Sequence, residues 1–179
     1  ILKIGTTSIT KDCDKGINLK ILESLAQSSS KIIANGYQVA IVSSGAMALG
    51  LARIGINKLE QKLGVNPCKD KLTSYKQALT AIGQIELMKE YQNLFAKENI
   101  EIGQVLVTHT GIKDEHRNTT LKETIEKLFE LNVVPIINAN DTVSPKQILS
   151  GDNDSLAARI AILLEAEKLF LLTDVDGLY

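Results

Sequence analysis

The chain has 179 residues, enough for one domain with a substantial core and hardly enough for two. Its 20 Lys and Arg residues nearly balance its 21 Asp and Glu residues, and it contains four Tyr, three Phe and no Trp. Nucleic-acid binders usually carry a basic surplus or a platform of stacking aromatic rings. The composition therefore argues against nucleic acid as a partner.

Membrane insertion and secretion are disfavoured as well. The most apolar segment, 160–172, is interrupted by three charged side chains and is too short to span a bilayer. The chain does not open with a signal-peptide pattern. Cys13 and Cys68 lie far apart and match no metal-ligand spacing, as in proteins of a reducing compartment. We expect a cytoplasmic protein with no membrane partner that acts on small molecules.

The first half of the chain alternates short apolar runs with amphipathic windows. In chain order, this pattern predicts a strand at 1–5, a helix at 18–35, a strand at 38–43, and helices at 45–54 and 72–99. Asn35 and Gly36 form a typical helix stop. Gly83 is expected to be a weak point of the last helix, and a longer polar connection containing Pro67 is expected before it.

The second half continues the alternation. It predicts a strand at 102–108, a helix at 115–131, a strand at 133–137, a helix at 153–166 and a strand at 168–173. Strands separated by helices pair in parallel because each crossover needs a helix, and continuously apolar strands are buried on both faces. We expect an α/β fold: a three-layer αβα sandwich with a mainly parallel sheet.

Glycines follow the first two predicted strands, where ligands bind in an open parallel sheet. Gly5 and Gly45 allow backbone N–H groups to approach a ligand closely, and free N–H groups at a helix start attract phosphate or carboxylate. Lys3 would add a positive charge to the first of these turns. Either turn alone is equally typical of an ordinary strand-to-helix connection. The chain has neither a Walker A nor a Gly-x-Gly-x-x-Gly pattern, so those folds do not supply the phosphate site.

Acidic and amide side chains gather at the end of the fourth strand and the start of the next helix. The group consists of Asn138, Asn140, Asp141, Asp152, Asn153 and Asp154. Helix capping accounts for one or two of the aspartates but not for the third. The cluster indicates an ammonium group, a lysine or a metal. An amino acid beside a phosphate donor is the simplest ligand pair that fits both the anion-binding turns and this acidic edge.

Seven segments, in order, resemble those of the amino-acid kinase family. They are KIGT at 3–6, IVSSG at 41–45, KQALTAIGQ at 76–84, GQVLVT at 103–108, VVPIINAND at 133–141, GDNDSL at 151–156 and LLTDVDGLY at 171–179. GDND placed after the INxND stretch is the most specific of them. Together they span essentially the whole chain. Within the family, the chain resembles members that use ATP to phosphorylate the side-chain carboxylate of L-glutamate, the first step of proline biosynthesis.

The resemblance implies a role for each matched residue. Two would be catalytic: Lys3 by holding the transferring phosphate and Asp154 by orienting the catalytic lysines. The nucleotide would contact Lys3, Gly5, Thr173 and Asp174. L-Glutamate would contact Ser44, Gly45, Asp141 and Asn153, with Asp152 supporting the same loop. Mg²⁺ is implied together with ATP, because phosphoryl transfer relies on neutralisation of charge by metal and lysine.

The resemblance also implies features outside these segments. The family usually has Glu where this chain has Ala139, so a loop hydrogen bond or an effector contact is expected to be missing. The family's glycine-rich segment, with a second catalytic lysine and most of the adenine pocket, is expected beyond Tyr179. Residues 1–179 are therefore interpreted as an amino-acid kinase domain without its C-terminal nucleotide-binding portion. Homo-oligomers and feedback inhibition by proline are further implications.

Two alternatives remain open from the sequence. One is another enzyme of the family, acting on acetylglutamate, aspartate or uridylate. The pairing of Asp141 with Asn153 favours a free amino group, which disfavours acetylglutamate and uridylate. The other alternative is an inactive fragment or regulatory subunit that binds glutamate or proline, which the missing second lysine supports.

Overall fold

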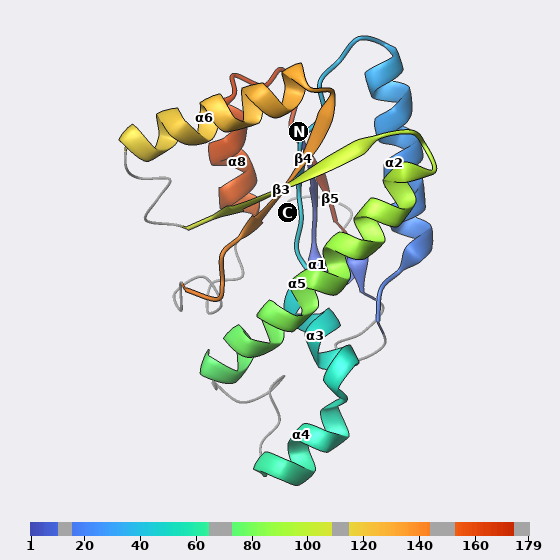
Figure 1. The fold of residues 1–179 in the computed structure, drawn as a ribbon, viewed down its shortest axis with the longest axis vertical. Helices are drawn as coiled ribbons and strands as arrows, with labels where there is room; N and C mark the ends of the chain where they lie inside the picture. Colours follow the sequence, from blue (N-terminus) through green and yellow to red (C-terminus); the bar gives the residue numbers. More distant parts are fainter. Residues whose placement is uncertain (11–15, 65–72, 109–114, 144–152, 174–179) are drawn as a thin grey trace, which may run out of the picture.

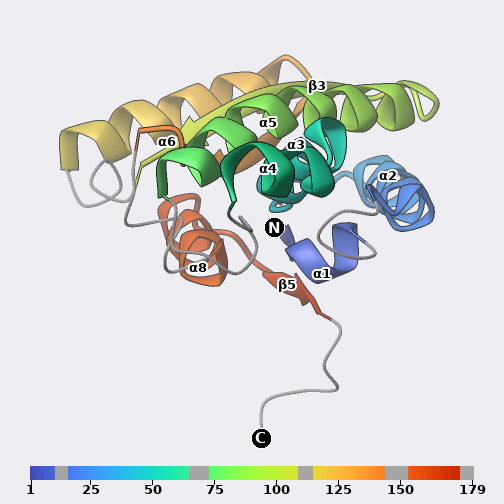
Figure 2. The same ribbon diagram turned by 90° about the horizontal axis from the view of Figure 1, so that it is seen from below.

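The computed structural model describes residues 1–10, 16–64, 73–108, 115–143 and 153–173, and these form an α/β fold around one five-stranded sheet. The strand order is β3-β4-β2-β1-β5, and every neighbouring pair is parallel. The strands are β1 (Leu2–Ile4), β2 (Ile41–Val42), β3 (Glu101–Val107), β4 (Val133–Ala139) and β5 (Phe170–Leu172). The predicted α/β class and parallel sheet are confirmed. Figure 2 shows β3 and β5 at opposite ends of the sheet.

Helices cover both faces of the sheet and make the fold a three-layer sandwich. They are α1 (Thr6–Ile9), α2 (Leu19–Ala34), α3 (Ala46–Ile54), α4 (Ile56–Leu63), α5 (Thr73–Ala96), α6 (Glu115–Glu130) and α8 (Asn153–Leu163). One hydrophobic core joins the sheet to α2, α3 and α5, and a second joins it to α6 and α8. Figure 1 shows α6 and α8 on the side of the strands opposite α2. Among the described residues, no helix is long and apolar enough to cross a bilayer.

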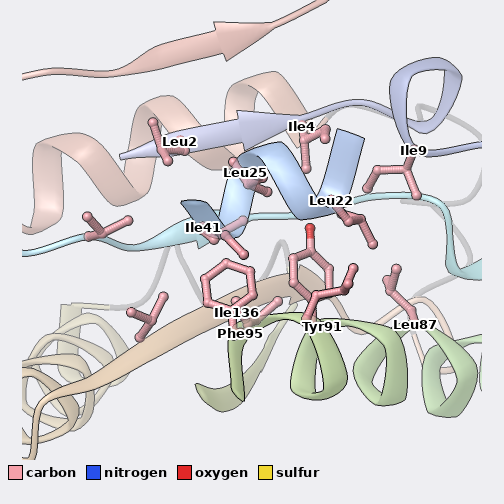
Figure 3. Close-up of a cluster of buried hydrophobic side chains, with 14 of the residues drawn as sticks. Leu2, Ile4, Ile9, Leu22, Leu25, Ile41, Leu87, Tyr91, Phe95 and Ile136 are labelled. Carbon is pink, nitrogen blue, oxygen red and sulfur yellow. The ribbon is translucent and has the colours of Figure 1, made fainter. Parts of the chain in front are cut away.

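The two central strands supply both cores because successive side chains of a strand point to opposite faces. Ile41 and Ile136 belong to the first core, whereas Val42 and Ile137 belong to the second. The first core is closed by aromatic side chains of α5, which Figure 3 shows pointing at the sheet. Each fully buried large side chain contributes about 1.5–3 kcal/mol through the hydrophobic effect, so the middle of the sheet is a stable platform.

Two glycines bring α3 and α5 into backbone contact. A Cβ added at Gly83 would lie 1.7 Å from the Ala46 carbonyl oxygen, and one added at Gly50 would lie 1.8 Å from the Leu79 carbonyl oxygen. Gly83, predicted as a weak point, does not interrupt the helix, since α5 runs unbroken from Thr73 to Ala96. The close packing offsets the low helix propensity of glycine, and it fixes the first turn of α3 against α5.

Two local predictions need correction. The stretch after α3, predicted as a polar connection, begins with the helix α4, which Figure 1 shows at the end of the molecule remote from the sheet. Ile56, Leu59 and Leu63 recur at helical spacing, so the sequence carried a signal for this short helix that the prediction of a polar connection missed. The strand predicted at 38–43 is confirmed only for β2, although flanking hydrogen bonds, Leu2 N to Ala40 O and Ser43 N to Ile137 O, extend its pairing.

Candidate active site

The carboxyl ends of neighbouring strands bring four distant parts of the sequence together. β4, β2, β1 and β5 lie side by side in that order. Gly5 follows β1, Ser43 to Gly45 follow β2, and Asn140 and Asp141 follow β4. Thr173 follows β5 and comes opposite Gly5, because Ile4 is paired with Leu172 in the preceding register position. The sequence placed candidate residues after each of these strands, and the parallel register gathers them at one edge.

Lys3 and Asp154 form an ion pair across this edge. The Lys3 Nζ lies 2.6 Å from the Asp154 Oδ1, with the lysine side chain only 12% exposed and the aspartate side chain 59% exposed. A Cβ added at Gly5 would lie 3.4 Å from the same Nζ, so the ammonium group sits directly over the Gly5 turn. Asp154 lies in the first turn of α8, which faces the strand ends. The ammonium group is thus held over a glycine turn that leaves room for a ligand.

Asn153, the first residue of α8, connects the helix to the end of β2. Its Nδ2 donates at 2.7 Å to the Ser43 carbonyl oxygen and at 2.7 Å to the Ser44 Oγ. The same Nδ2 lies 3.2 Å from the Oδ1 of Asn138 on β4. Asn153 and Ser44, both predicted to bind the substrate, are therefore in direct contact, one residue away from the Lys3–Asp154 pair.

A buried polar network continues beneath Asn153. The Asn138 Nδ2 donates to the Gln84 Oε1 at 2.9 Å, and the Asn138 Oδ1 accepts from the Ala139 N–H at 2.8 Å. Asn138 and Gln84 are buried. Buried polar groups of this kind are costly unless they are hydrogen-bonded, so the network holds the site in one arrangement.

A second buried contact supports the serine turn. The hydroxyl of Tyr91 donates to the Ser43 Oγ at 3.0 Å, and the Ser43 Oγ donates to the Ser44 carbonyl oxygen at 3.2 Å. Burial raises the pKa of the Tyr91 phenol, which therefore stays protonated as a donor. Figure 3 shows the hydroxyl of Tyr91 at the end of the ring that faces the strands.

The sequence interpretation gave no role to Gln84, Ser43 or Tyr91. Gln84 was noted only as the end of a matched segment, and Asn138 only as a member of the acidic and amide cluster. A signal in the sequence could have identified Gln84 and Asn138, namely a polar side chain within an apolar pattern. Each is a polar residue at a buried position of an otherwise apolar pattern, which requires a buried partner.

Asp141 follows β4 as a half-buried carboxylate. Burial raises its pKa from an ordinary value of 3.8 to about 6. The turn around it is held by a hydrogen bond from the Thr142 Oγ1 to the Asn140 Oδ1 at 2.6 Å and by one from the Gln77 Nε2 to the Thr142 carbonyl oxygen at 3.2 Å. A carboxylate that is partly removed from water gains most from a cationic partner, and an ammonium group would supply one.

Gly45 begins α3 in the left-handed backbone region, with φ of 95°. This conformation favours glycine, and an added Cβ would also lie 3.2 Å from the Ile9 Cγ2. No side chain of the described residues caps α3. Its first N–H groups are therefore suited to an anionic ligand such as a carboxylate.

The residues predicted to contact the nucleotide are described only in part. Asp152 and Asp174 lie outside the described residues, whereas Thr173 is described and exposed. Within the described ranges, no group of three or more His, Cys, Asp or Glu side chains could hold a metal ion. The nearby Asp154 is paired with Lys3.

A hollow lies at the opposite end of the sheet, near the amino ends of β1 and β5. It encloses about 380 Å³ and is lined by Tyr37, Phe129, Leu164 and Phe170 among others. None of the predicted site residues lines it. We place the candidate active site at the carboxyl ends, because the ion pair, the half-buried Asp141 and the buried amides all lie there.

The parallel αβα sandwich and the lysine and amide groups at its strand ends define a class of small-molecule-binding α/β domain. The chain belongs to the amino acid kinase family, whose model matches residues 1–179. A solved structure described as "X-ray structures of isopentenyl phosphate kinase" has the same fold, with a TM-score of 0.64 and 22% identity over 99% of this chain and 72% of that one.

Relatives of known name are more similar in sequence. The glutamate 5-kinase of Alkaliphilus oremlandii (strain OhILAs) is 43% identical over 179 residues, which is all of this chain and 64% of that protein. The glutamate 5-kinases of Synechococcus elongatus (strain ATCC 33912 / PCC 7942 / FACHB-805) and Symbiobacterium thermophilum (strain DSM 24528 / JCM 14929 / IAM 14863 / T) are 39% and 38% identical over the whole chain. The chain covers 46% and 64% of their lengths, respectively.

Proposed function

We propose that this chain is the amino-acid-binding part of an ATP-dependent kinase that phosphorylates the side-chain carboxylate of L-glutamate. The product is L-glutamyl 5-phosphate, and the reaction is the first step of proline biosynthesis. The similarity to glutamate 5-kinases along the whole chain supports this substrate. The observation that carries the proposal is the contact of Asn153 with Ser44 beside the Lys3–Asp154 ion pair. It joins amino-acid-binding groups to a phosphate-binding cation.

The charges of the site match the charges of the substrate. The carboxylate of Asp141 takes the substrate ammonium, together with Asn153. The Ser44 hydroxyl and the N–H groups that follow Gly45 take a carboxylate. This arrangement directs the amino-acid end of L-glutamate towards β4 and α8. It disfavours acetylglutamate and uridylate, neither of which has a free ammonium group to neutralise Asp141.

In the transfer step, an oxygen of the side-chain carboxylate forms a bond to the terminal phosphorus of ATP. The bond from that phosphorus to the bridging oxygen breaks, and ADP leaves with the electron pair. Lys3 stabilises the negative charge of the phosphoryl group, and Asp154 keeps its ammonium group in position. Gly5, Thr173 and Asp174 contact the nucleotide, and Asp152 supports the loop that binds L-glutamate. Mg²⁺ bound with ATP supplies further neutralisation of phosphate charge.

The wider setting is part of the same proposal. The full-length protein is a cytoplasmic homo-oligomer, and proline acts as its feedback inhibitor. Residues 1–179 form its amino-acid kinase domain, and most of the adenine site lies outside them.

The test is substrate-dependent release of ADP by the full-length protein with ATP and Mg²⁺. We expect release with L-glutamate, and trapping of the product by hydroxylamine as a hydroxamate, because acyl phosphates react with this nucleophile. N-acetyl-L-glutamate, L-aspartate and uridylate should give little release. Release with one of these three but not with L-glutamate would assign a different reaction. A thermal shift with L-glutamate but no ADP release would show binding without kinase activity.

A further inference from the structure

Gln84 is a buried polar side chain that lies one contact away from the proposed substrate site. It is 9% exposed, and its Oε1 accepts a hydrogen bond from the Asn138 Nδ2 at 2.9 Å. Its Nε2 is buried without a hydrogen-bond partner among the described residues. Leaving a buried donor unpaired costs stability, so a polar residue at this position calls for a reason other than packing.

Backbone groups fix the direction in which the amides of this network point. The Ala139 N–H can only donate, so the Asn138 atom that faces it at 2.8 Å must be the oxygen Oδ1. The Asn138 Nδ2 is then turned towards Gln84, which must present its own oxygen. Gln84 therefore adds a second contact to the orientation of Asn138 that the Ala139 N–H selects.

Asn153 is oriented by the same rule. The Ser43 carbonyl can only accept, so the Asn153 atom that faces it at 2.7 Å must be Nδ2. The two hydrogens of this group serve the acceptors on Ser43 and Ser44, and the longer contact of 3.2 Å to the Asn138 Oδ1 shares one of them. These three contacts use only the Nδ2 of Asn153, so its Oδ1 is left to accept from a cation.

Ser44 gains a defined role from the same contact. Its Oγ accepts the hydrogen bond from the Asn153 Nδ2, so the Ser44 hydroxyl hydrogen is left to donate. The two residues together offer an acceptor for an ammonium group and a donor for a carboxylate. Reversal of either amide would place two donors or two acceptors face to face.

We propose that Gln84 is a positioning residue for amino-group recognition. The Ser43 carbonyl directs the Asn153 Nδ2, and Gln84 adds to this by supporting Asn138, whose Oδ1 contacts the same Nδ2 at 3.2 Å. This added support keeps the Asn153 Oδ1 available to the substrate ammonium and the Ser44 hydroxyl available to a substrate carboxylate. The proposal rests on the proposed function in taking L-glutamate as the ligand. Gln84 itself does not touch the substrate, and its effect reaches the site through Asn138 and Asn153.

The test compares two substitutions on α5 in the full-length protein. Gln84→Met keeps the length of the side chain and removes the acceptor for Asn138. Thr80→Val is the matched control: Thr80 lies one turn earlier and is also buried, and among the described residues its side chain bonds only to the Lys76 carbonyl oxygen of its own helix. Gln84→Met should raise the KM for L-glutamate about tenfold, on the order of one lost hydrogen bond to a charged group, with kcat and the KM for ATP nearly unchanged. Thr80→Val should change none of the three.

Selectivity separates positioning from a general loss of structure. Gln84→Met should weaken the binding of L-glutamate more than that of glutarate, which lacks the amino group, whereas damage to the fold would weaken both to the same extent. If the ratio of the affinity for L-glutamate to the affinity for glutarate is the same in Gln84→Met and Thr80→Val, the proposal is overturned. If Gln84→Met does not fold, Gln84→Asn shortens the side chain by one methylene, withdraws the acceptor and serves as the second variant.

A ligand-free measurement keeps this inference distinct from the proposed function. Hydrogen exchange of the Asn153 side-chain NH₂, followed by ¹⁵N NMR and assigned through its loss in Asn153→Ser, should be slow in the parent protein and in Thr80→Val. It should be faster in Gln84→Met. Unchanged exchange in Gln84→Met would reject the role of Gln84 whatever the ligand. Failure of the parent protein to bind L-glutamate would reject the proposed function alone.

Discussion

The two ends of the sheet are built by different means. At the amino ends, four helix-to-strand turns each contain one residue with positive φ: Gly36, Asn99, Asn132 and Glu165. Their backbone hydrogen bonds are local, such as Ile100 N to Phe95 O and Ala166 N to Ala161 O. At the carboxyl ends, the contacts join distant residues, as in the bonds from Asn153 to Ser43 and from Asn138 to Gln84.

The amino-end turns therefore serve the fold, whereas the carboxyl-end contacts position the groups of the candidate site. A local turn satisfies the last carbonyl groups of a helix with the N–H groups that follow, and it needs no other part of the chain. The carboxyl-end network holds amide and hydroxyl groups out of water, which succeeds only when each partner arrives in the correct orientation. Substitutions at the carboxyl ends should therefore change ligand binding and rate, and those at the amino ends should change stability.

The largest effect is expected for Asp154→Asn in the full-length protein. The amide keeps the shape of the side chain but removes the charge that holds the Lys3 ammonium at 2.6 Å. Turnover should fall about 10²–10³-fold, by analogy with removal of one preorganised electrostatic contact. Steady-state kinetics and circular dichroism would check the rate and the fold. Near-normal turnover in a correctly folded variant would reject this role of Asp154.

Lys3→Ala should lower kcat more than it weakens the binding of L-glutamate. The lysine charge matters most while the phosphoryl group is in transit, so its removal is mainly a loss of transition-state stabilisation. The measurement is the pair of kcat and KM values for L-glutamate. A raised KM with unchanged kcat would place Lys3 at the amino acid instead of the phosphate.

Gly83→Ala tests the packing beneath the site, and its sign decides between two effects. Helix propensity alone predicts a gain of up to about 1 kcal/mol. The structure predicts a loss of about 1–3 kcal/mol from overpacking, because the new Cβ would lie 1.7 Å from the Ala46 carbonyl oxygen. Denaturant unfolding measures the difference. A stabilised variant would show that α3 and α5 are not in backbone contact.

Asp141 should make the binding of L-glutamate depend on pH. Its pKa of about 6 means that the carboxylate becomes charged, and able to pair with an ammonium group, as the pH rises through 6. Affinity should increase between about pH 5 and pH 7 in the parent protein and stay nearly flat in Asp141→Asn. Calorimetric titrations across this range measure both profiles, and parallel profiles would remove Asp141 from the binding site.

The same carboxyl group should affect the stability of the ligand-free protein. Because its folded-state pKa is raised above the ordinary value of 3.8, folding favours the protonated form. The stabilisation is fully present below 3.8 and is lost as the pH rises through about 6. The melting temperature of the parent protein, relative to that of Asp141→Asn, should therefore fall as the pH rises across this interval. A difference that does not change with pH would contradict the raised pKa.

The smallest effect is expected at the amino ends. Asn132 has φ of 58°, so Asn132→Ala should cost about 1 kcal/mol of stability, whereas Asn132→Gly should cost almost nothing. Neither variant should alter the KM for L-glutamate or the preference for it over glutarate. Urea unfolding measures the change in stability, and steady-state kinetics measure the KM and the preference for L-glutamate over glutarate. A change in this preference would show that the amino-end turns affect the site.

Most of the fold could be predicted from the sequence because its signals are local. The periodicity and the stop signal at Asn35 and Gly36 predicted a helix at 18–35, and α2 covers Leu19–Ala34. A feature with a distant cause could not be predicted: Gly83 fits inside α5 because Gly50 lies against it. No pattern within a single helix contains that information.

The site divides in the same way. The positions of Lys3, Ser44, Gly45 and Asp141 follow from strand ends, so their gathering at one edge could be expected from the parallel order. The part played by Gln84 could not, because its hydrogen-bond partner is 54 residues away on β4. Hydrogen-bond direction depends on which backbone group faces each amide, and only the assembled structure supplies it.

Calorimetric titration of the full-length protein with L-glutamate and with glutarate tests the central claim most directly. If Asp141 and Asn153 hold the substrate ammonium, L-glutamate should bind and glutarate should bind more weakly by roughly 1.5–3 kcal/mol, the usual value of hydrogen bonds to a charged group. N-acetyl-L-glutamate should be as poor as glutarate, and Asp141→Asn should narrow the gap. Equal binding of glutarate and L-glutamate by the parent protein would contradict the account. Helix capping alone would then be the explanation for the aspartates of the cluster, Asp141, Asp152 and Asp154.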